Sequence, residues 1–201
     1  MEYLICALIG YLFGSFSTSY FIGKLKGFDI RQKGTGNAGA SNITISLGWK
    51  WGILTALVDI LKGFLAVFLT RRLFPDIPSA PFIGGCAATL GHIFPFYLKF
   101  KGGKGYATFT GMVLGLNWKL ALFVMLWGTV VTLISDYIAL ATISSAILVA
   151  VCFIIKGCDT ISAVCLIFTA AVIVYKHKIN IIRMLHHEEF GLRDSGKHRV
   201  K

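Results

Sequence analysis

Long apolar segments separated by short polar ones make up most of the chain. A helix that crosses a bilayer needs about 20 predominantly apolar residues, or fewer where protein shields it. Seven segments fit this description, and two of them are short: Tyr3–Ile22, Trp49–Thr70, Phe82–Tyr97, Ala107–Asn117, Leu120–Ile134, Tyr137–Ile155 and Thr160–Tyr175. The pattern predicts an all-α fold, a polytopic membrane bundle of about seven transmembrane helices.

Two places leave the count open between five and seven. The segment Ala107–Asn117 is short enough to be re-entrant, which is tolerated at membrane depth only where protein covers the backbone. The break at Ser135-Asp136-Tyr137 is so tight that one long kinked helix is the alternative there. The first segment lacks a basic leader and runs on into more apolar sequence, so we expect a retained span and not a cleaved signal peptide.

Composition favours one membrane domain over residues 1–201. The chain has 201 residues, of which 56% are hydrophobic, and a mean hydropathy of +0.74. The tail over residues 176–201 is too short for a second domain. The net charge of +11 is concentrated at the ends of apolar segments, a pattern of membrane orientation and anionic ligands. No nucleic-acid partner is expected, and a monomer is plausible.

The distribution of basic residues predicts the orientation. Cytoplasmic loops of membrane proteins carry an excess of Lys and Arg. Lysines and arginines follow the first and third segments and fill the tail, and fewer lie on the opposite side, at Arg71, Arg72, Lys119 and Lys156. With seven spans this places the N-terminus outside and the C-terminus inside, in the cytoplasmic (inner) cell membrane. The polar stretches and the tail then share the cytoplasmic face.

Two glycine-rich stretches interrupt the apolar pattern on that face. Gly-rich turns expose backbone N–H groups, and with nearby Lys or Asn donors they suit phosphate. The first stretch runs over residues 34–42 and includes Asn37, Gly39, Ser41 and Asn42. The second runs over residues 101–108 and places Lys104 among Gly102, Gly103 and Gly105 just before a predicted helix. It is not a nucleotide-binding P-loop, and a flexible basic turn is the alternative.

A third polar stretch follows the last apolar segment. His177, Asn180 and Arg183 are three residues apart, so a helix presents them on successive turns toward one interfacial cleft. The run His186-His187-Glu188-Glu189 lacks a metal-binding spacing. Five scattered cysteines argue against a zinc site or a disulfide framework. No metal and no other cofactor are expected.

One charged pair lies inside an apolar segment. Asp59 and Lys62 are three residues apart, so on a helix they face the same side and can pair. Charges within the membrane are costly unless they are paired or hydrated. The pair is either a structural ion pair or one wall of a polar cleft. His92, near the aromatic end of the third segment, is expected to be a capped side chain without a further role.

Together the motifs resemble the bacterial PlsY family of acyl-phosphate-dependent glycerol-3-phosphate acyltransferases. The resemblance runs from about Gly14 to Glu189 and rests on three ordered motifs: Gly36-Asn37-x-Gly39-x-Ser41-Asn42, Phe100-Lys101-Gly102-Gly103-Lys104-Gly105-x-Ala107-Thr108, and His177-Lys178-x-Asn180-Ile181-x-Arg183 with Glu189 in register. The chain departs from the family pattern at five positions. Relatives usually have arginine at Ile45, proline at Ser17, serine at Ala139, glycine at His187 and lysine at Gly191.

The resemblance implies transfer of an acyl chain from acyl phosphate to the 1-hydroxyl of glycerol 3-phosphate, the first step of phospholipid synthesis. Its partners are then those two substrates and membrane lipid. Lys104, His177 and Asn180 are the implied catalytic residues, with Lys104 and the neighbouring glycine amides as a phosphate cradle. The implied substrate-binding residues are Asn37, Gly39, Ser41, Asn42, Gly102, Gly103, Gly105, Thr108, Thr142, Arg183 and Glu189.

Other classes fit less well. A small membrane transporter of an organic phosphate or anion is the main alternative, although the chain has no internal repeat and its motifs lie on one face. A CDP-alcohol phosphotransferase needs an Asp-rich metal motif, which is absent from the sequence. The chain also lacks the His-x4-Asp pair with which another acyltransferase class activates a hydroxyl.

Overall fold

Helices form all the regular structure of residues 1–189 and 191, which are the residues described by the computed structural model. Ten α-helices and two short 3-10 helices follow one another along these residues. The α-helices are α1 Glu2–Ser15, α2 Thr18–Leu25, α3 Ala40–Leu47, α4 Trp49–Leu73, α5 Ala80–Ile93, α6 Tyr106–Leu116, α7 Trp118–Ser135, α8 Ile138–Ile155, α9 Thr160–Lys176 and α10 Lys178–Leu185. The 3-10 helices are η1 Ile30–Gln32 and η2 Phe96–Leu98. The all-α prediction is confirmed for these residues.

Several of the predicted membrane helices are long and apolar enough to span a bilayer. Four segments meet that test in the described residues: Glu2–Leu25, α4, α7 and α8. A fifth is reached if α9 and α10, which meet at a bend of 53°, are taken together. At 14 and 11 residues, α5 and α6 are shorter. The membrane bundle is thus confirmed, while the count of seven spans stays a prediction.

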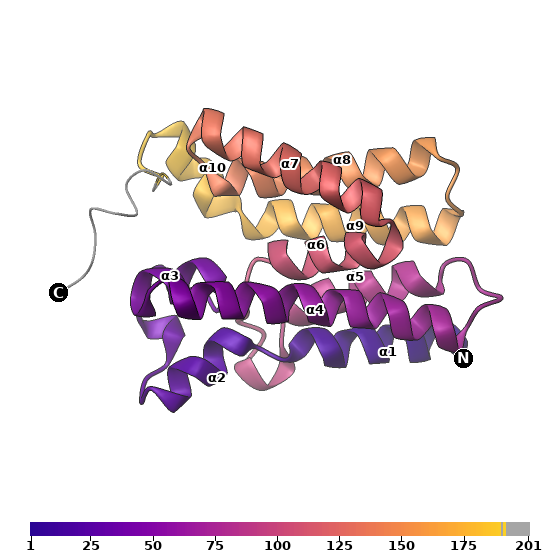
Figure 1. The fold of residues 1–201 in the computed structure, drawn as a ribbon, viewed down its shortest axis with the longest axis horizontal. Coiled ribbons are helices and arrows are strands. Elements are labelled where there is room, and N and C mark those ends of the chain that lie inside the picture. The colour runs from indigo at the N-terminus through magenta and orange to yellow at the C-terminus, as the bar shows by residue number, and fades with distance from the viewer. Residues whose placement is uncertain (190, 192–201) are drawn as a thin grey trace.

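The break between α7 and α8 separates two helices that pack side by side. Asp136 has φ 68°, in the left-handed region, and ends α7. Both helices run along the length of the molecule and contact each other (Figure 1). A single long helix kinked at this point is therefore wrong, because a left-handed residue reverses the chain where a kink only bends it.

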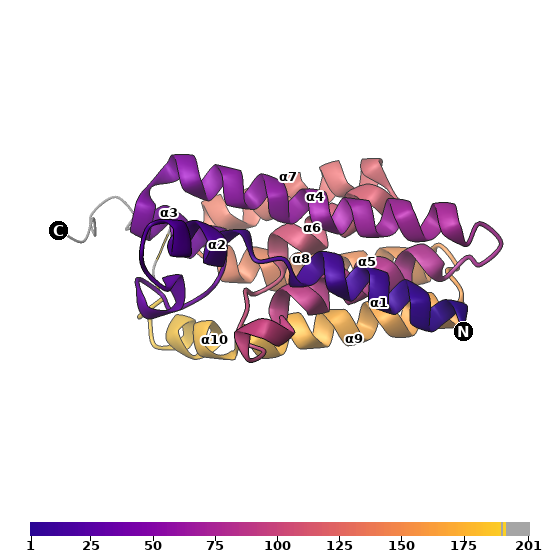
Figure 2. The ribbon, with the colours of Figure 1, turned by 90° about the horizontal axis from the view of Figure 1, so that it is seen from below.

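The polar motifs gather at one end of the bundle. The N-terminus lies at one end of the long axis, while α3 and α10 lie at the other (Figure 1). A view turned by 90° gives the same arrangement (Figure 2). Since the first motif leads into α3 and the third forms α10, both occupy the end opposite the N-terminus. This agrees with the predicted convergence, and the side of the membrane stays a prediction.

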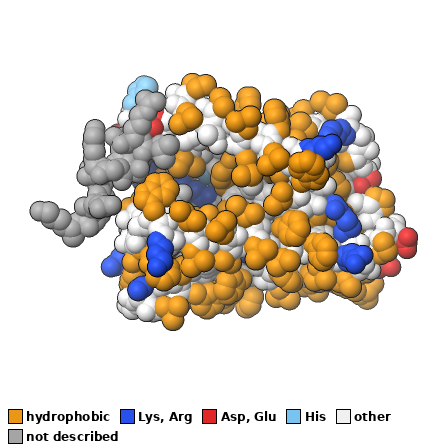
Figure 3. Space-filling model, viewed as in Figure 1, with side chains coloured by type: hydrophobic (Ala, Val, Ile, Leu, Met, Phe, Trp, Pro, Cys, Tyr) orange, Lys and Arg blue, Asp and Glu red, His pale blue; other side chains and the backbone are white. Residues whose placement is uncertain are grey.

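Small residues let the helices pack closely. A methyl group at Gly14 of α1 would clash with the backbone of Ala88 in α5, and one at Gly111 of α6 would clash with the backbone of Ile60 in α4. Membrane helices often associate through such small residues. The outside of the bundle is covered largely with apolar side chains (Figure 3), as expected for a surface in contact with lipid.

The first predicted span is broken into two helices. α1 ends at Ser15 and α2 begins at Thr18, and such a break frees backbone groups that need partners inside a membrane. The Tyr97 hydroxyl donates to Ser15 O at 2.8 Å and accepts from Ser17 N at 3.0 Å. The Lys62 ammonium donates to Phe16 O at 2.7 Å. The resemblance predicts proline at Ser17, and here the Ser17 N–H makes a bond that proline lacks.

Candidate active site

The loop that carries Lys104 is fastened to the end of α5. Gly102 N donates to Ile93 O at 3.1 Å, and Gly103 N donates to His92 O at 3.0 Å. Both amides therefore satisfy carbonyls that a helix end leaves without partners. The N–H groups of Gly102 and Gly103 are thus engaged by α5, and their predicted contact with phosphate stays a prediction.

The remaining part of the cradle is the start of α6. Gly105 has φ +96° and caps this helix, and its carbonyl accepts from Phe109 N. The first amides of a helix have no partner within it and attract anions. Thr108, in the first turn, is fully buried, and its hydroxyl has no hydrogen-bond partner among the described residues. Lys104 and this helix start thus form the cationic side of the site.

A chain of hydrogen bonds joins the second motif to the third. Lys104 Nζ donates to Asn180 Oδ1 at 2.6 Å. The Asn180 amide in turn donates to Glu189 Oε1. Because an ammonium only donates and a carboxylate only accepts, the chain fixes which way the Asn180 amide faces. Three residues predicted for the site thus meet, although 76 positions separate Lys104 from Asn180.

The environment of Lys104 favours an anionic ligand. Burial lowers the pKa of Lys104 below its usual range, and the charges of Arg183 and Lys176 lower it further, while Glu189 raises it. A partly desolvated ammonium interacts more strongly with a phosphate than one in bulk water does. Basic atoms also lie in a hollow of the surface toward the end that carries α3 and α10 (Figure 3).

His177 lies at the bend between α9 and α10, beyond the apolar helix. Its Nδ1 lies 2.8 Å from Ile173 O. A carbonyl oxygen only accepts, so Nδ1 carries the proton and Nε2 of the neutral ring is an acceptor. Burial lowers the pKa of His177 to about 4, with smaller contributions in the same direction from Lys104 and Lys176. The ring is therefore neutral near pH 7 and can accept a hydrogen bond from a hydroxyl.

The first motif is organised around Asn42. Its side-chain amide lies within 3.0 Å of the carbonyl oxygens of Ile30, Lys33 and Asn37, and its Oδ1 accepts from Thr35 N at 2.8 Å. The side chain is fully buried. Asn42 therefore holds this loop in shape through both ends of its amide, and its contact with substrate stays a prediction.

The other predicted residues of this motif are placed differently. Gly39 caps α3, and Ser41 lies in its first turn with an exposed side chain. Asn37 is half-buried beside Gly39. Ile45 is 39% exposed on the same helix. Within residues 1–189 and 191, no hydrogen bond joins Ser41 or Asn37 to Lys104, so their contact with substrate stays a prediction.

Two further predicted residues lie around the cationic end. Arg183 is exposed on α10, and its charge acts on Lys104. Thr142 is buried on α8, but its hydroxyl donates to Ile138 O at 2.9 Å. Because its proton is used in this bond, the Thr142 hydroxyl can only accept a hydrogen bond from a ligand.

Gly191 is packed against the carboxylate of Asp136, so a side chain at position 191 would require the two residues to separate.

Sequence reasoning missed a buried network behind the loop. The predicted pair of Asp59 and Lys62 is confirmed, with Lys62 Nζ 2.8 Å from Asp59 Oδ1. The ammonium also lies 2.8 Å from His92 Nδ1. His92, expected to be only a capped side chain, thus belongs to this ion pair. The signal was present in the sequence, since a charged pair within an apolar helix calls for further polar partners.

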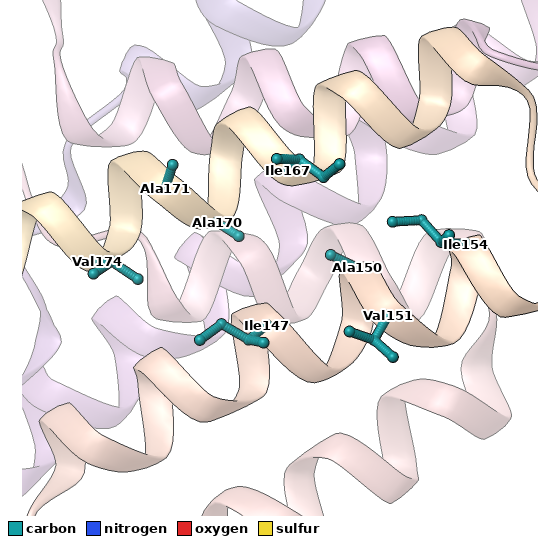
Figure 4. Close-up of a pocket in the computed structure, with 8 residues that line it drawn as sticks. All are labelled: Ile147, Ala150, Val151, Ile154, Ile167, Ala170, Ala171 and Val174. Atoms are coloured by element: carbon teal, nitrogen blue, oxygen red, sulfur yellow. The ribbon is translucent and has the colours of Figure 1, made fainter.

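An apolar groove runs between α8 and α9. Side chains from both helices line it (Figure 4): Ile147, Ala150, Val151, Ile154, Ile167, Ala170, Ala171 and Val174. Val174 lies three residues before His177, which is about 4.5 Å along a helix axis. The groove therefore ends beside the third motif.

The apolar helices define a multi-pass membrane protein, and Lys104 and Arg183 place positive charge toward one end of its bundle. The sequence model described as glycerol-3-phosphate acyltransferase matches residues 4–187. The chain belongs to this family of membrane acyltransferases, and the resemblance seen in its motifs is confirmed.

Individual relatives agree with this assignment. The chain is 36% identical over 185 residues to the glycerol-3-phosphate acyltransferase of Aquifex aeolicus, covering 92% of this chain and 96% of the relative. It is 39% identical over 199 residues to that of Staphylococcus aureus strain Newman, with coverage of 94% and 97%.

Solved structures give the same result. The crystal structure of PlsY (YgiH), an integral membrane glycerol 3-phosphate acyltransferase, in its glycerol 3-phosphate form matches with a TM-score of 0.90, 34% identity and 98% coverage of each chain. Its lysophosphatidic acid form matches with a TM-score of 0.86 at 34% identity, covering 98% of this chain and 100% of that one.

Proposed function

We propose that the protein transfers an acyl chain from acyl phosphate to the 1-hydroxyl of glycerol 3-phosphate at the cytoplasmic face of the inner membrane. The products are 1-acylglycerol 3-phosphate and inorganic phosphate. The observation that carries the proposal is the contact of Lys104 with Asn180, since it brings the glycine-rich loop of Lys104 and the polar helix α10 together at one cationic site. The two forms of PlsY (YgiH), one with glycerol 3-phosphate and one with lysophosphatidic acid, support both substrate and product.

The site has separate places for the parts of the two substrates. Lys104 and the start of α6 offer positive charge for a phosphate, with Arg183 nearby. The groove between α8 and α9 is apolar and ends beside His177, so it suits the acyl chain. An acyl phosphate whose chain lies in this groove brings its carbonyl carbon to the polar end of the bundle.

The residues favour orientation and charge stabilisation over acid–base chemistry. The 1-hydroxyl donates to His177 Nε2 and attacks the carbonyl carbon, and the bond from that carbon to the phosphate oxygen breaks. With a pKa of about 4, His177 is a poor proton acceptor at neutral pH. The phosphate oxygen becomes strongly basic as its bond to the carbonyl carbon breaks, so the hydroxyl proton passes from its hydrogen bond with Nε2 to the leaving phosphate. Lys104 stabilises the negative charge of that group.

A sharp test distinguishes transfer from transport. Purified protein in detergent is given acyl phosphate and radiolabelled glycerol 3-phosphate, and lysophosphatidic acid and free phosphate are both measured. We expect the two products in a ratio of one to one. Sealed vesicles containing the protein are then tested for uptake of the same label. Uptake without product formation would replace the proposal with the transporter alternative.

A further inference from the structure

We propose that His92 is a positioning residue for the loop of residues 101–105, with its ring fixed by the buried pair of Lys62 and Asp59. The reaction that the loop serves is the proposed acyl transfer, so the kinetic part of the inference rests on that function. The structural part concerns only how the loop is held.

The Lys62 ammonium sits at a junction of three helical elements. It lies 2.7 Å from Phe16 O at the break between α1 and α2, 2.8 Å from Asp59 Oδ1 in α4, and 2.8 Å from His92 Nδ1 in α5. Lys62 is 4% exposed, Asp59 2% and His92 5%. The contacts with Phe16 O and His92 Nδ1 are hydrogen bonds, and the contact with Asp59 Oδ1 is an ion pair.

This arrangement decides the state of the His92 ring. Because the ammonium of Lys62 donates, Nδ1 of His92 accepts, and the ring proton of the neutral imidazole is on Nε2. The bond to Nδ1 also fixes how the ring is turned.

The other edge of the ring lies against the loop. A methyl group at Gly103 would clash with Nε2, Cε1 and Cδ2 of His92, so the backbone of Gly103 rests directly on this edge. The same two residues share a backbone bond, from Gly103 N to His92 O. His92 thus holds the loop through both its ring and its carbonyl.

The position of Gly103 bears on Lys104, the next residue. Lys104 reaches Asn180 at 2.6 Å, and a catalytic group that moves by about 1 Å can cost about a hundredfold in rate. The network therefore links the ion pair inside the bundle to the placement of the site lysine. Lys62 and Asp59 thus act on the site through His92, although neither of them lies in the loop.

Two substitutions separate the contacts of the ring. His92→Asn keeps an oxygen near the position of Nδ1, so Lys62 keeps its acceptor, but the shorter side chain no longer reaches Gly103. His92→Gln keeps the reach toward Gly103 and loses the acceptor. Thr70→Val is the matched control, because Thr70 is a fully buried polar residue of α4 whose hydroxyl bonds only within its own helix.

The first measurement is amide hydrogen exchange of the loop in purified protein, which needs no turnover. We expect faster exchange over residues 99–109 in His92→Asn, a smaller rise in His92→Gln, whose side chain still reaches Gly103 but is no longer fixed by Lys62, and none in Thr70→Val. Unchanged loop exchange in His92→Asn, or an equal rise in Thr70→Val, would overturn the proposal. A wild-type protein that turns over no substrate would instead overturn the proposed function and leave this result standing.

The second measurement is a double-mutant cycle in kcat/KM. We expect His92→Asn to lower kcat/KM about tenfold in the wild-type background and to have much less effect when Lys104 is already alanine. Loss that multiplies fully in the double variant would show that the two residues act independently and would contradict the proposal. Loss in His92→Gln with wild-type kcat/KM in His92→Asn would assign the effect to the Lys62 contact and not to the contact with Gly103, and would contradict the proposal as well.

Discussion

Replacing Lys104 with alanine removes the centre of the cationic site and little else. The side chain donates to Asn180 Oδ1, and burial lowers its pKa, so its ammonium is partly withdrawn from water. The loop around it is held by the amides of Gly102 and Gly103 and does not depend on the lysine. We therefore expect Lys104→Ala to fold and to lose activity.

The expected fall in kcat/KM follows from the charge-assisted contact between Lys104 and the substrate phosphate, which the alanine variant cannot make. A hydrogen bond to a charged group contributes about 1.5–3 kcal/mol. At about 1.4 kcal/mol for each factor of ten, this corresponds to about a tenfold to about a 150-fold fall in kcat/KM. Lys104→Arg should recover only part of the activity, because a guanidinium differs from an ammonium in reach and geometry.

The assay is the rate of lysophosphatidic acid formation over a range of glycerol 3-phosphate concentrations. Lys101→Ala is the matched control, since Lys101 is an exposed lysine of the same loop. We expect the control to stay within about twofold of wild type, as surface charges have small effects. If Lys104→Ala purifies normally and matches Lys101→Ala in kcat/KM, Lys104 lies outside the site and the reasoning fails.

Three further predictions concern pH, stability and topology. His177 is neutral above its pKa of about 4. His177→Asn should therefore lower kcat/KM without changing the pH dependence of kcat/KM between about pH 5.5 and about pH 8.5. A step near pH 6.5 in the wild-type protein that is absent from the variant would contradict this. Lys62→Met leaves the buried Asp59 charge unpaired and should destabilise the protein by about 3–5 kcal/mol in thermal unfolding, with partial recovery when Asp59→Asn is added; an unchanged Tm would refute it. An impermeant thiol reagent on intact cells should label Cys158 and spare a cysteine placed at Lys104; the reverse result would invert the orientation.

The apolar pattern predicted where most helices lie. Segments such as Trp49–Thr70 and Tyr137–Ile155 are recovered almost unchanged as α4 and α8, because the length of an apolar segment is set by the bilayer itself. The break after Ser15 was not predictable in this way. It depends on partners from remote positions, Lys62 and Tyr97, which take up the freed backbone groups.

Residue types and spacing also predicted much of the site. Lys104, Asn180 and Glu189 were all named, and the structure joins them. The bonds from the backbone amides of Gly102 and Gly103 to the C-terminal carbonyls of α5 were not predictable, because only the packing of the loop on that helix shows them. The same applies to Asn42, whose donors turn inward to close its own loop.

The most direct test of the account is a comparison of acyl donors. Purified protein is given glycerol 3-phosphate with either acyl phosphate or acyl-CoA of the same chain length, and lysophosphatidic acid is measured at matched concentrations. The account predicts rapid formation with acyl phosphate and little with acyl-CoA, because the site offers Lys104 and the start of α6 to a compact phosphate next to an acyl groove. Equal turnover with both donors, or product from acyl-CoA alone, would contradict it.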